Sequence, residues 1–514
     1  MHNHELRRWS PALLVAGLAS SVLMFPVVAQ ASAPVGGPEA ARIAQLEAEV
    51  AELKTIVEAL VLKSAVKTPS WGKAPETSDD SSDFTFKPRG RLMYDVGFLS
   101  NPDDAIVTRN LGFQSRARRV RLGAEGNIAG GFGYQFEIDY ANAAIGFGNV
   151  VLTYAPKNRP YVFTFGNHET LNGLEQMTSS RFLSFVERAA FNEAFINTRR
   201  IGLSAGLANS DNSLRLNAGL FTAHGIDGSF DNDGWIGAAR ASYAPRIGED
   251  SQLHLGLSIQ HREFQSNNSQ GGTSASPNAP STNQLARYRA RPSVLLSDVR
   301  FIDTGSFAAK SDTIFGIEAG GIFQSLHVIA EGQYLKVDAH RPGDRIDSAD
   351  PLDSFPSGSA TAPAGDPGFW GAFFETGYYL TGETRGYRNG LWDRTKVLRP
   401  LSKGGSGAFQ LNGRVDYLDL DSGRLKRGVI NDFVTGGTST SPSAVGLGRG
   451  GKQLGLLGNL IWIPEDNLRF YFQYGRSRVT GGPFAAIVDP NSDNPIDIRN
   501  YWVDSFVTRA SFDF

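Results

Sequence analysis

Residues 132–141 read FGYQFEIDYA, and the alternation in this stretch decides the fold class. Every even position from 132 to 140 carries an aromatic or aliphatic side chain, in the order Phe, Tyr, Phe, Ile, Tyr. Gln135, Glu137 and Asp139 occupy odd positions. A period of two is that of a β-strand. An apolar face opposite a charged face is typical of a strand that lies between lipid and a water-filled lumen.

The same alternation recurs along most of the chain beyond residue 83. Examples are VRLGAEGN at 120–127 and LRFYFQYG at 468–475. In the first such segment the apolar parity comprises Phe84, Phe86, Leu92, Tyr94, Val96 and Phe98. The segments begin near residues 84, 113, 131, 145, 160, 199, 213, 234, 251, 312, 325, 368, 406, 451, 466 and 499. We therefore predict an all-β fold, a transmembrane antiparallel β-barrel of about 16 strands over residues 84–514.

The connections between these segments alternate between short and long. AGG, APKNRP, SDN, PRIGED, QS and PEDN are tight turns, whereas residues 168–198, 264–311, 339–367, 422–450 and 480–498 form long connections. Outer-membrane barrels have short periplasmic turns and long external loops. An even strand count then leaves both ends of the barrel in the periplasm. The second external loop is almost absent, and residues 383–405 are long for a periplasmic turn.

The N-terminal residues predict export from the cytoplasm. Arg7 and Arg8 precede an apolar run over residues 12–28 and the small-residue sequence AQA at 29–31, which is a signal peptide pattern for residues 1–31. The alternative, a membrane anchor helix, is disfavoured because the run falls short of roughly 20 apolar residues. No later stretch is apolar over that length. We expect the protein in the bacterial outer membrane, with its N-terminal segment in the periplasm.

Residues 39–63 predict a short coiled-coil helix. The apolar positions alternate in steps of three and four, at Ile43, Leu46, Val50, Leu53, Val57 and Leu60. A solvated amphipathic helix is the alternative, and the oligomeric state of the helix stays open. Residues 64–83, rich in Pro, Ser and Asp, form a linker to the barrel.

Composition excludes several function classes. The chain has no cysteine, which removes disulfides, thiol catalysis and thiolate metal sites. With 58 Gly, 33 Phe and a mean hydropathy of −0.23, it is too polar for a helical membrane protein. A formal charge of −2 gives no basic excess, so nucleic acid is not expected as a partner. The eight His residues form no motif with a serine nucleophile, and we predict no catalytic residue, metal or cofactor.

The chain ends in VTRASFDF at 507–514, a strand that finishes in an aromatic residue. This ending resembles the signal read by the machinery that inserts barrels into the outer membrane. That machinery, outer-membrane lipid and lipopolysaccharide are the expected partners.

Four separated blocks resemble the family of phosphate-selective porins O and P. They are residues 174–203, 378–387 (YYLTGETRGY), 407–420 (GAFQLNGRVDYLDL) and 450–475, in that order along the barrel. The resemblance implies a homotrimeric porin whose third external loop folds inward to narrow the pore. It places the constriction at Thr178, Ser179, Ser180, Arg181, Glu187 and Arg188.

The family is described as guiding anions along a ladder of arginines in the lumen. We expect nine arginines in such a ladder, because each one has the inward parity of its strand or lies at the end of the third loop. They are Arg89, Arg91, Arg119, Arg121, Arg199, Arg200, Arg215, Arg240 and Arg414. A guanidinium suits phosphate because it keeps its charge and donates two parallel hydrogen bonds. Carboxylates share the inward parity, at Asp95, Glu125, Glu137, Asp139, Glu318, Glu331 and Glu375. The alternative for each arginine is a wall residue paired to a carboxylate.

The sequence therefore predicts a porin for passive diffusion of small anions, with phosphate and polyphosphate as candidate solutes. The alternative is a structural barrel that tethers the membrane to the cell wall or to a periplasmic partner through its coiled coil. A tether would need residues 39–63, whereas a porin would tolerate their deletion. A sugar porin would need aromatic residues along the pore, and most aromatics here share the outward parity.

Overall fold

The computed structural model describes residues 48, 77–78, 84–102, 110–141, 145–195, 198–223, 225–226, 234–264, 285–305, 307–340, 363, 365–425, 430–432, 437–439, 450–483 and 499–514. The chain divides into two compact units, residues 1–68 and 69–514. In the first unit only Ala48 is described, and it is helical. The predicted signal peptide, and nearly all of the predicted coiled coil and linker, lie outside the described residues. None of the described helices is long and apolar enough to cross a membrane.

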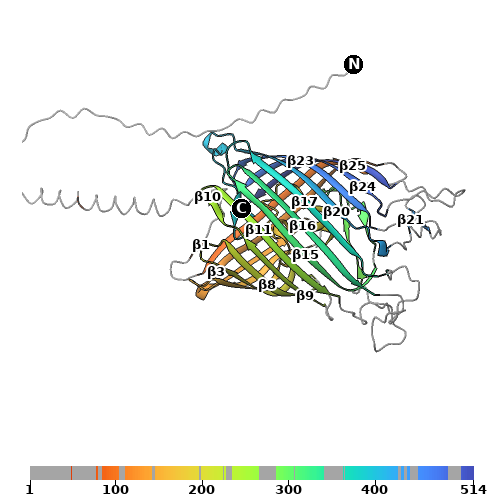
Figure 1. The fold of residues 1–514 in the computed structure, drawn as a ribbon. Helices are drawn as coiled ribbons and strands as arrows, with labels where there is room; N and C mark the ends of the chain where they lie inside the picture. The colour runs from red at the N-terminus through yellow and green to blue at the C-terminus, as the bar shows by residue number, and fades with distance from the viewer. Residues whose placement is uncertain are drawn as a thin grey trace, which may run out of the picture. The chain divides into compact units, whose positions relative to one another are not determined.

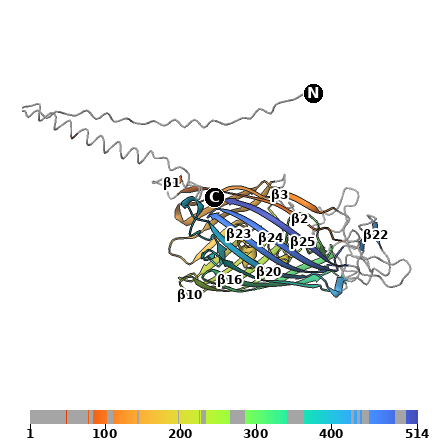
Figure 2. The same ribbon diagram turned by 90° about the horizontal axis from the view of Figure 1, so that it is seen from above.

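Sixteen antiparallel strands form a closed barrel, which confirms the predicted fold and strand number (Figures 1 and 2). They are β2 (Thr85–Leu99), β3 (Gly112–Ile128), β4 (Phe132–Asp139), β5 (Gly146–Tyr154), β6 (Tyr161–His168), β7 (Arg200–Ala208), β8 (Leu214–Thr222), β9 (Trp235–Tyr243), β11 (Ser251–Glu263), β15 (Phe307–Phe323), β16 (Leu326–Ala339), β17 (Gly368–Tyr379), β20 (Ala408–Asp419), β23 (Lys452–Glu465), β24 (Leu468–Thr480) and β25 (Asn500–Asp513). Each strand pairs with the next one in this order, and β25 pairs with β2 from Arg91↔Asp513 to Leu99↔Ser505, which closes the barrel.

The remaining elements are short and lie in the connections or beside the barrel. They are β1 (Thr77–Ser78), η1 (Ala129–Gly131), α2 (Leu174–Met177), α3 (Ala190–Ala194), β10 (Arg246–Gly248), β12 (Leu285–Ala286), β13 (Arg289–Ala290), β14 (Ile302–Asp303), β18 (Gly386–Arg388), β19 (Leu391–Asp393), η3 (Leu401–Lys403), η4 (Gly423–Leu425), β21 (Ile430–Asp432) and β22 (Gly437–Ser439). The tight turns lie at the end of the barrel that carries the C-terminus (Figure 1). The start of β2 is at the same end, since the amide of Gly90 donates to the carbonyl oxygen of Phe514 at 3.1 Å.

The two faces of the wall separate as the alternation predicts. Along β2 and the residue before it, Phe84, Leu92 and Tyr94 face outward and are exposed. Arg91 and Asp95 of the same strand face inward and are buried. The outward residues would contact lipid in a membrane, and the inward ones meet polar groups of the lumen.

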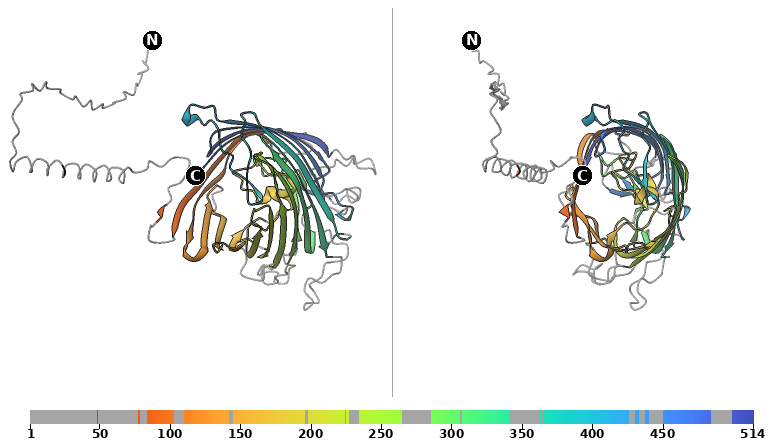
Figure 3. Two further views of the ribbon diagram at one scale, coloured as in Figure 1. Left: turned by 60° about the vertical axis from the view of Figure 1, so that its left-hand side comes forward. Right: turned by 90° about the vertical axis from the view of Figure 1, so that its left-hand side faces the viewer.

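Three connections contribute buried residues to the inside of the barrel. We call them L3 (residues 169–199, between β6 and β7), L5 (264–306, between β11 and β15) and T6 (380–407, between β17 and β20). Figure 3 shows the yellow segment of L3 inside the ring of strands. Apolar residues of all three pack into one buried cluster, for example Phe191 of L3, Phe301 of L5 and Trp392 of T6.

The charged-inside pattern predicted for the lumen does not extend to every strand. Leu335 of β16, Phe369 and Phe373 of β17, and Ile461 of β23 face inward and belong to the same buried cluster. These strands meet the apolar sides of L3 and L5 rather than water, so burial favours apolar residues there. The lumen thus has one packed side, and the open space lies along the opposite wall, formed by β2 to β7.

Candidate functional site

L3 begins with a backbone geometry that requires glycine. Gly173 has a φ of 46°, and a Cβ on this residue would lie 2.3 Å from a carboxylate oxygen of Glu331. The close approach lets that carboxylate accept a hydrogen bond at 2.9 Å from the amide of Glu175, in the first turn of α2. Glu331 on β16 therefore fixes the point at which L3 turns into the lumen.

Ion pairs and hydrogen bonds attach the rest of L3 to the packed side of the barrel. Arg414 on β20 bonds to the carboxylates of Glu175 in L3 and Glu375 on β17. Asp416, two residues further on, accepts from the amide of Ala190 at 2.8 Å. Arg414 is buried and lies over the ring of Phe373. This arginine holds the loop, and its place in an anion path stays a prediction.

The middle of L3 is held by β25 and β3. Arg509 pairs with Asp95 through two hydrogen bonds of 2.6 Å, and it also bonds to the carbonyl of Val186 and to Glu187. Arg118 binds Glu187 from the other side, at 2.6 and 2.9 Å. Burial alone would raise the pKa of Glu187, but the charges of Arg118 and Arg509 hold this pKa well below its ordinary value. Glu187 is therefore ionised and bridges two strands.

L5 supports L3 from the loop end of the barrel. Arg291 of L5 bonds to Glu193 of α3 through its guanidinium and, at 2.9 Å, through its backbone amide. Arg300 reaches the same carboxylate at 3.2 Å. The two loops thus form one unit, joined by a shared carboxylate as well as by their apolar contacts.

T6 enters the barrel from the turn end as a small hairpin. Strands β18 and β19 are joined by Asn389 and Gly390, whose φ values of 55° and 77° are those of a tight two-residue turn. Arg240 on β9 donates to the carbonyl of Gly390 at 3.2 Å, and Arg215 on β8 donates to the side chain of Asn389 at 3.2 Å. Arg385 of T6 also donates to the hydroxyl of Ser184 and to the carbonyl oxygen of Phe182, both in L3. L3 and T6 meet inside the lumen.

Two adjoining cavities remain between these loops and the wall of β2 to β7. The loop-side cavity, about 530 Å³, lies between β3, L3 and L5, and the middle cavity, about 400 Å³, lies between β2, L3 and T6. They share Glu169, Arg119, Arg121, Arg188 and Arg199 in their linings. A turn-side cavity of about 380 Å³ shares Glu125 and Gln135 with the middle one. The shared lining residues place the three cavities next to one another along the barrel, and we call the three together the passage.

The lining of the first two cavities is strongly basic. It contains eleven arginines, Arg89, Arg91, Arg118, Arg119, Arg121, Arg181, Arg188, Arg199, Arg200, Arg291 and Arg388. It contains six carboxylates, Glu125, Glu137, Glu169, Glu187, Glu193 and Asp393. The excess of five positive charges is local, since the whole chain has a formal charge of −2. Such a field in a narrow site concentrates anions.

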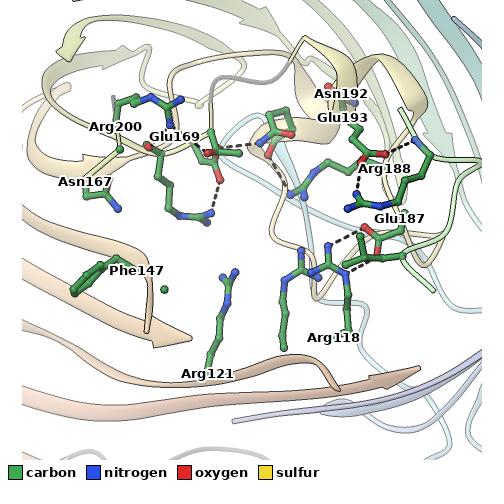
Figure 4. Close-up of a pocket in the computed structure, with 18 of the residues that line it drawn as sticks. Arg118, Arg121, Phe147, Asn167, Glu169, Glu187, Arg188, Asn192, Glu193 and Arg200 are labelled. Carbon is green, nitrogen blue, oxygen red and sulfur yellow. Dashed lines mark hydrogen bonds and ion pairs between the residues drawn. The ribbon is translucent and has the colours of Figure 1, made fainter. Parts of the chain in front are cut away.

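Most of these arginines are partly neutralised by neighbours. Arg121 bonds to Glu137 and to Asp139, each at 2.7 Å, and Arg199 pairs with Glu169 at 2.9 Å. Arg188 donates instead to three backbone carbonyls at the end of α2, at 2.7 to 3.2 Å. Figure 4 shows Arg118 and Arg121 extending from β3 towards L3 across the cavity.

Arg119 differs from its neighbours because it donates to no oxygen atom of the described residues. Its one hydrogen-bonding contact within them runs from Nη1 to the sulfur of Met93 at 3.7 Å, and its buried Nε has no partner there. It lines both the loop-side and the middle cavity. A buried charge without a partner is costly.

A β-bulge brings Arg118 and Arg119 to the same face. Met93 of β2 pairs with Arg119 and Tyr94 pairs with Ala117, so Arg118 is the additional residue. Sequence parity selected Arg119 and missed Arg118. The available signal was the adjacency of the two arginines, because strict alternation would have placed one of them against lipid at a cost of about 2–4 kcal/mol at the membrane midplane.

The structure separates the predicted site residues into two groups. Those that line the passage are Arg89, Arg91, Arg119, Arg121, Arg199, Arg200, Thr178, Ser179, Ser180, Arg181, Glu187 and Arg188. Arg215, Arg240 and Arg414 line neither of the two main cavities. Arg240 is buried in a bidentate pair with Glu318, at 2.8 and 2.7 Å, and its place in an anion path stays a prediction from parity alone. Arg291 of L5 and Arg388 of T6 were missed because loop residues have no parity.

Comparisons with known proteins agree with this architecture. The family model for phosphate-selective porin O and P matches residues 86–485. A relative from Caulobacter vibrioides, named only as an uncharacterized protein, is 34% identical over 421 residues, which cover 80% of this chain and 72% of that protein.

Solved structures show more distant similarity. The anion-selective porin from Comamonas acidovorans has a TM-score of 0.42 at 10% identity, covering 84% of this chain and 100% of that one. The outer membrane channel DcaP of Acinetobacter baumannii has a TM-score of 0.43 at 11% identity, covering 85% and 99%. Similarity this low says nothing about what the chain transports.

Proposed function

The chain belongs to the phosphate-selective porin O and P family, and on that premise we propose that it is a passive channel for small anions. The family and the barrel indicate a porin of the bacterial outer membrane rather than an enzyme. The preference for anions is our proposal. It is carried by one observation, the excess of five positive charges in the lining of the loop-side and middle cavities.

The spacing of these charges supports movement along the wall rather than capture at one point. Arg118 and Arg291 belong to the loop-side cavity, Arg119 and Arg121 to both main cavities, and Arg89 to the middle one. An anion can therefore exchange one guanidinium for the next. Partial neutralisation by glutamates keeps each contact weak enough for release, which conduction requires.

Phosphate and polyphosphate are the candidate solutes within this proposal. A guanidinium offers two parallel donors to an oxyanion, whereas chloride has no fixed directions for such a fork. The hydroxyl groups of Thr178, Ser179 and Ser180 line the middle cavity and can donate to the same oxyanion. We also propose a homotrimer with the long loops outside and the N-terminal segment in the periplasm.

The proposal is tested with the purified full-length protein in planar lipid bilayers. Under a KCl gradient the reversal potential should have the sign of an anion-selective pore, and added phosphate should reduce the chloride current. Deletion of residues 39–63 should leave both properties unchanged. A cation-selective reversal potential, or a folded protein that does not conduct, would contradict the proposal.

A further inference from the structure

Two arginines of β24 face away from the lumen. Arg476 and Arg478 have the parity of Phe472 and Tyr474, which are exposed on the outside of the barrel, whereas Gln473 between them is buried inside. Half of the Arg476 side chain is exposed. A charged side chain on the lipid face costs about 2–4 kcal/mol at the membrane midplane and about 0–1 kcal/mol near the surfaces. Both arginines should therefore lie at a membrane surface.

Their height on the strand agrees with this position. β24 leaves its tight turn at Leu468, and Arg478 is ten residues further on. With a rise of about 3.4 Å per residue and a tilt of about 40°, ten residues climb about 26 Å. The apolar band of an outer-membrane barrel is about 25 Å tall. Arg478 thus reaches the headgroup layer at the loop end of the barrel. Arg476, eight residues from Leu468, climbs about 21 Å and lies about 4 Å below the edge of the band, a distance that a long arginine side chain can span.

The neighbours of these arginines orient them and leave donors available. Arg476 lies over the ring of Trp502, with Cζ 4.8 Å from the ring centre, and its Nε is 3.6 Å from Asp504. Arg478 donates through Nε to the side-chain oxygen of Asn500 at 3.1 Å. The terminal Nη nitrogens of both guanidinium groups have no acceptor within the described part of the chain. Four directed donor nitrogens therefore remain on the outer surface.

We propose that Arg476 and Arg478 form a binding site for the anionic headgroup of an outer-leaflet lipid. Two residues apart on one strand, their guanidinium groups can grip one phosphate through their terminal nitrogens. Trp502 is of the residue type that anchors at the headgroup level. Lys452 on β23 lies opposite Thr480 and adds a third positive charge, although it is paired with Asp419 at 3.0 Å.

This site is separate from the passage, because its residues face outward from the barrel and the passage lies inside. It requires the outer-membrane location, with the long loops facing the cell exterior. A barrel with no anion preference could still carry the lipid site, and an anion channel could lack it. The two proposals therefore fail independently.

The test compares binding of two lipids to the purified full-length protein in detergent. One is lipid A with both phosphates, and the other is the same lipid with its phosphates removed. Each basic residue near a charged membrane surface contributes roughly fivefold in affinity, so R476Q/R478Q should weaken binding of the phosphorylated lipid about thirtyfold. Binding of the dephosphorylated lipid should not change. The matched control R159Q/R246Q removes two exposed arginines from the turn end and should keep the parent affinity.

Several results would overturn the lipid site. The first is that the control R159Q/R246Q loses as much affinity for the phosphorylated lipid as R476Q/R478Q does. The second is that the parent protein binds both lipids equally. The third is that inorganic phosphate, at the same concentration as the lipid, displaces the lipid completely. A changed oligomeric state of R476Q/R478Q with unchanged lipid binding would assign the patch to a protein interface instead. Should the double variant not fold, the parent's affinity for the phosphorylated lipid must still fall with added salt, and a salt-independent affinity refutes the proposal.

Discussion

Replacing Arg119 by Gln is the sharpest perturbation of the passage. Arg119 lines both main cavities and has no carboxylate partner among the described residues. Arg121 lies two residues away on the same strand, and Asp139 partly cancels its charge at 2.7 Å. The double variant R121Q/D139N removes an ion pair without changing the net charge. It is therefore the matched control for R119Q.

The expected magnitude follows from Coulomb's law. Two unit charges 4 Å apart interact by about 1 kcal/mol in bulk water and by about 4 kcal/mol at an effective dielectric constant of about 20. A water-containing passage lies between these limits. Loss of the Arg119 charge should thus weaken anion binding by about 1–3 kcal/mol, or about 5- to 150-fold.

The assay is inhibition of single-channel chloride current by phosphate, with the reversal potential measured in parallel. R119Q should raise the phosphate concentration needed for half inhibition about 5- to 150-fold, and it should lower the preference for anions in the reversal potential. R121Q/D139N should change the inhibition and the reversal potential much less. R119K keeps the charge but loses the two-donor fork, so it should weaken phosphate inhibition more than chloride passage. All differences should shrink in about 1 M salt, where the screening length is about 3 Å.

Two outcomes would refute this reasoning. If R119Q inserts normally and keeps the parent's inhibition by phosphate at low salt, the unpaired guanidinium is not a binding group for the solute. If R121Q/D139N loses as much affinity as R119Q, paired and unpaired arginines contribute alike. The local charge excess would then not explain selectivity.

Three further predictions concern L3. Deleting residues 174–194 removes both of its helices and should raise single-channel conductance several-fold, so unchanged conductance in a folded protein would contradict a constriction there. R509Q leaves Asp95 buried without its partner and should lower the free energy of unfolding by about 3–5 kcal/mol, measured by denaturant unfolding in detergent. The lowered pKa of Glu187 means that its ion pairs stabilise the loop above about pH 4 and are lost only in stronger acid, so conductance should stay constant from about pH 7 to about pH 5. A conductance change within that range that E187Q abolishes would contradict this.

The barrel could be predicted from the sequence because its wall separates two solvents. Each strand has lipid on one side and the lumen on the other, so the requirement is local and leaves a period of two in every strand. Phe132 and Phe136 on β4 illustrate this, since both are exposed on the outside, while Glu137 on the same strand is buried inside. The strand number then followed from counting segments.

The parts of the site that come from loops left weaker signals. Asn389-Gly390 is a strong sequence signal for a hairpin, and the excess length of residues 383–405 indicates an insertion at the same place. No local sequence pattern, however, indicates that this hairpin turns into the lumen. Inward apolar residues such as Phe369 and Phe373 indicate that something covers them. Which loop does so depends on contacts between distant segments, which single-strand patterns do not encode.

The division between paired and unpaired arginines is the least predictable feature, and it is the one on which the proposed selectivity depends. Arg119 and Arg121 have the same residue type, strand and parity, so the sequence treats them as equivalent. They differ because Asp139 and Glu137 of β4 bond to Arg121, whereas Arg119 lies opposite Met93 beside the bulge. A shift of two residues in the pairing of β3 with β4 would place Asp139 opposite Arg119 instead of Arg121. The charge that a solute meets is therefore set by strand register and by the bulge, and a count of inward arginines overestimates the number that can bind an anion.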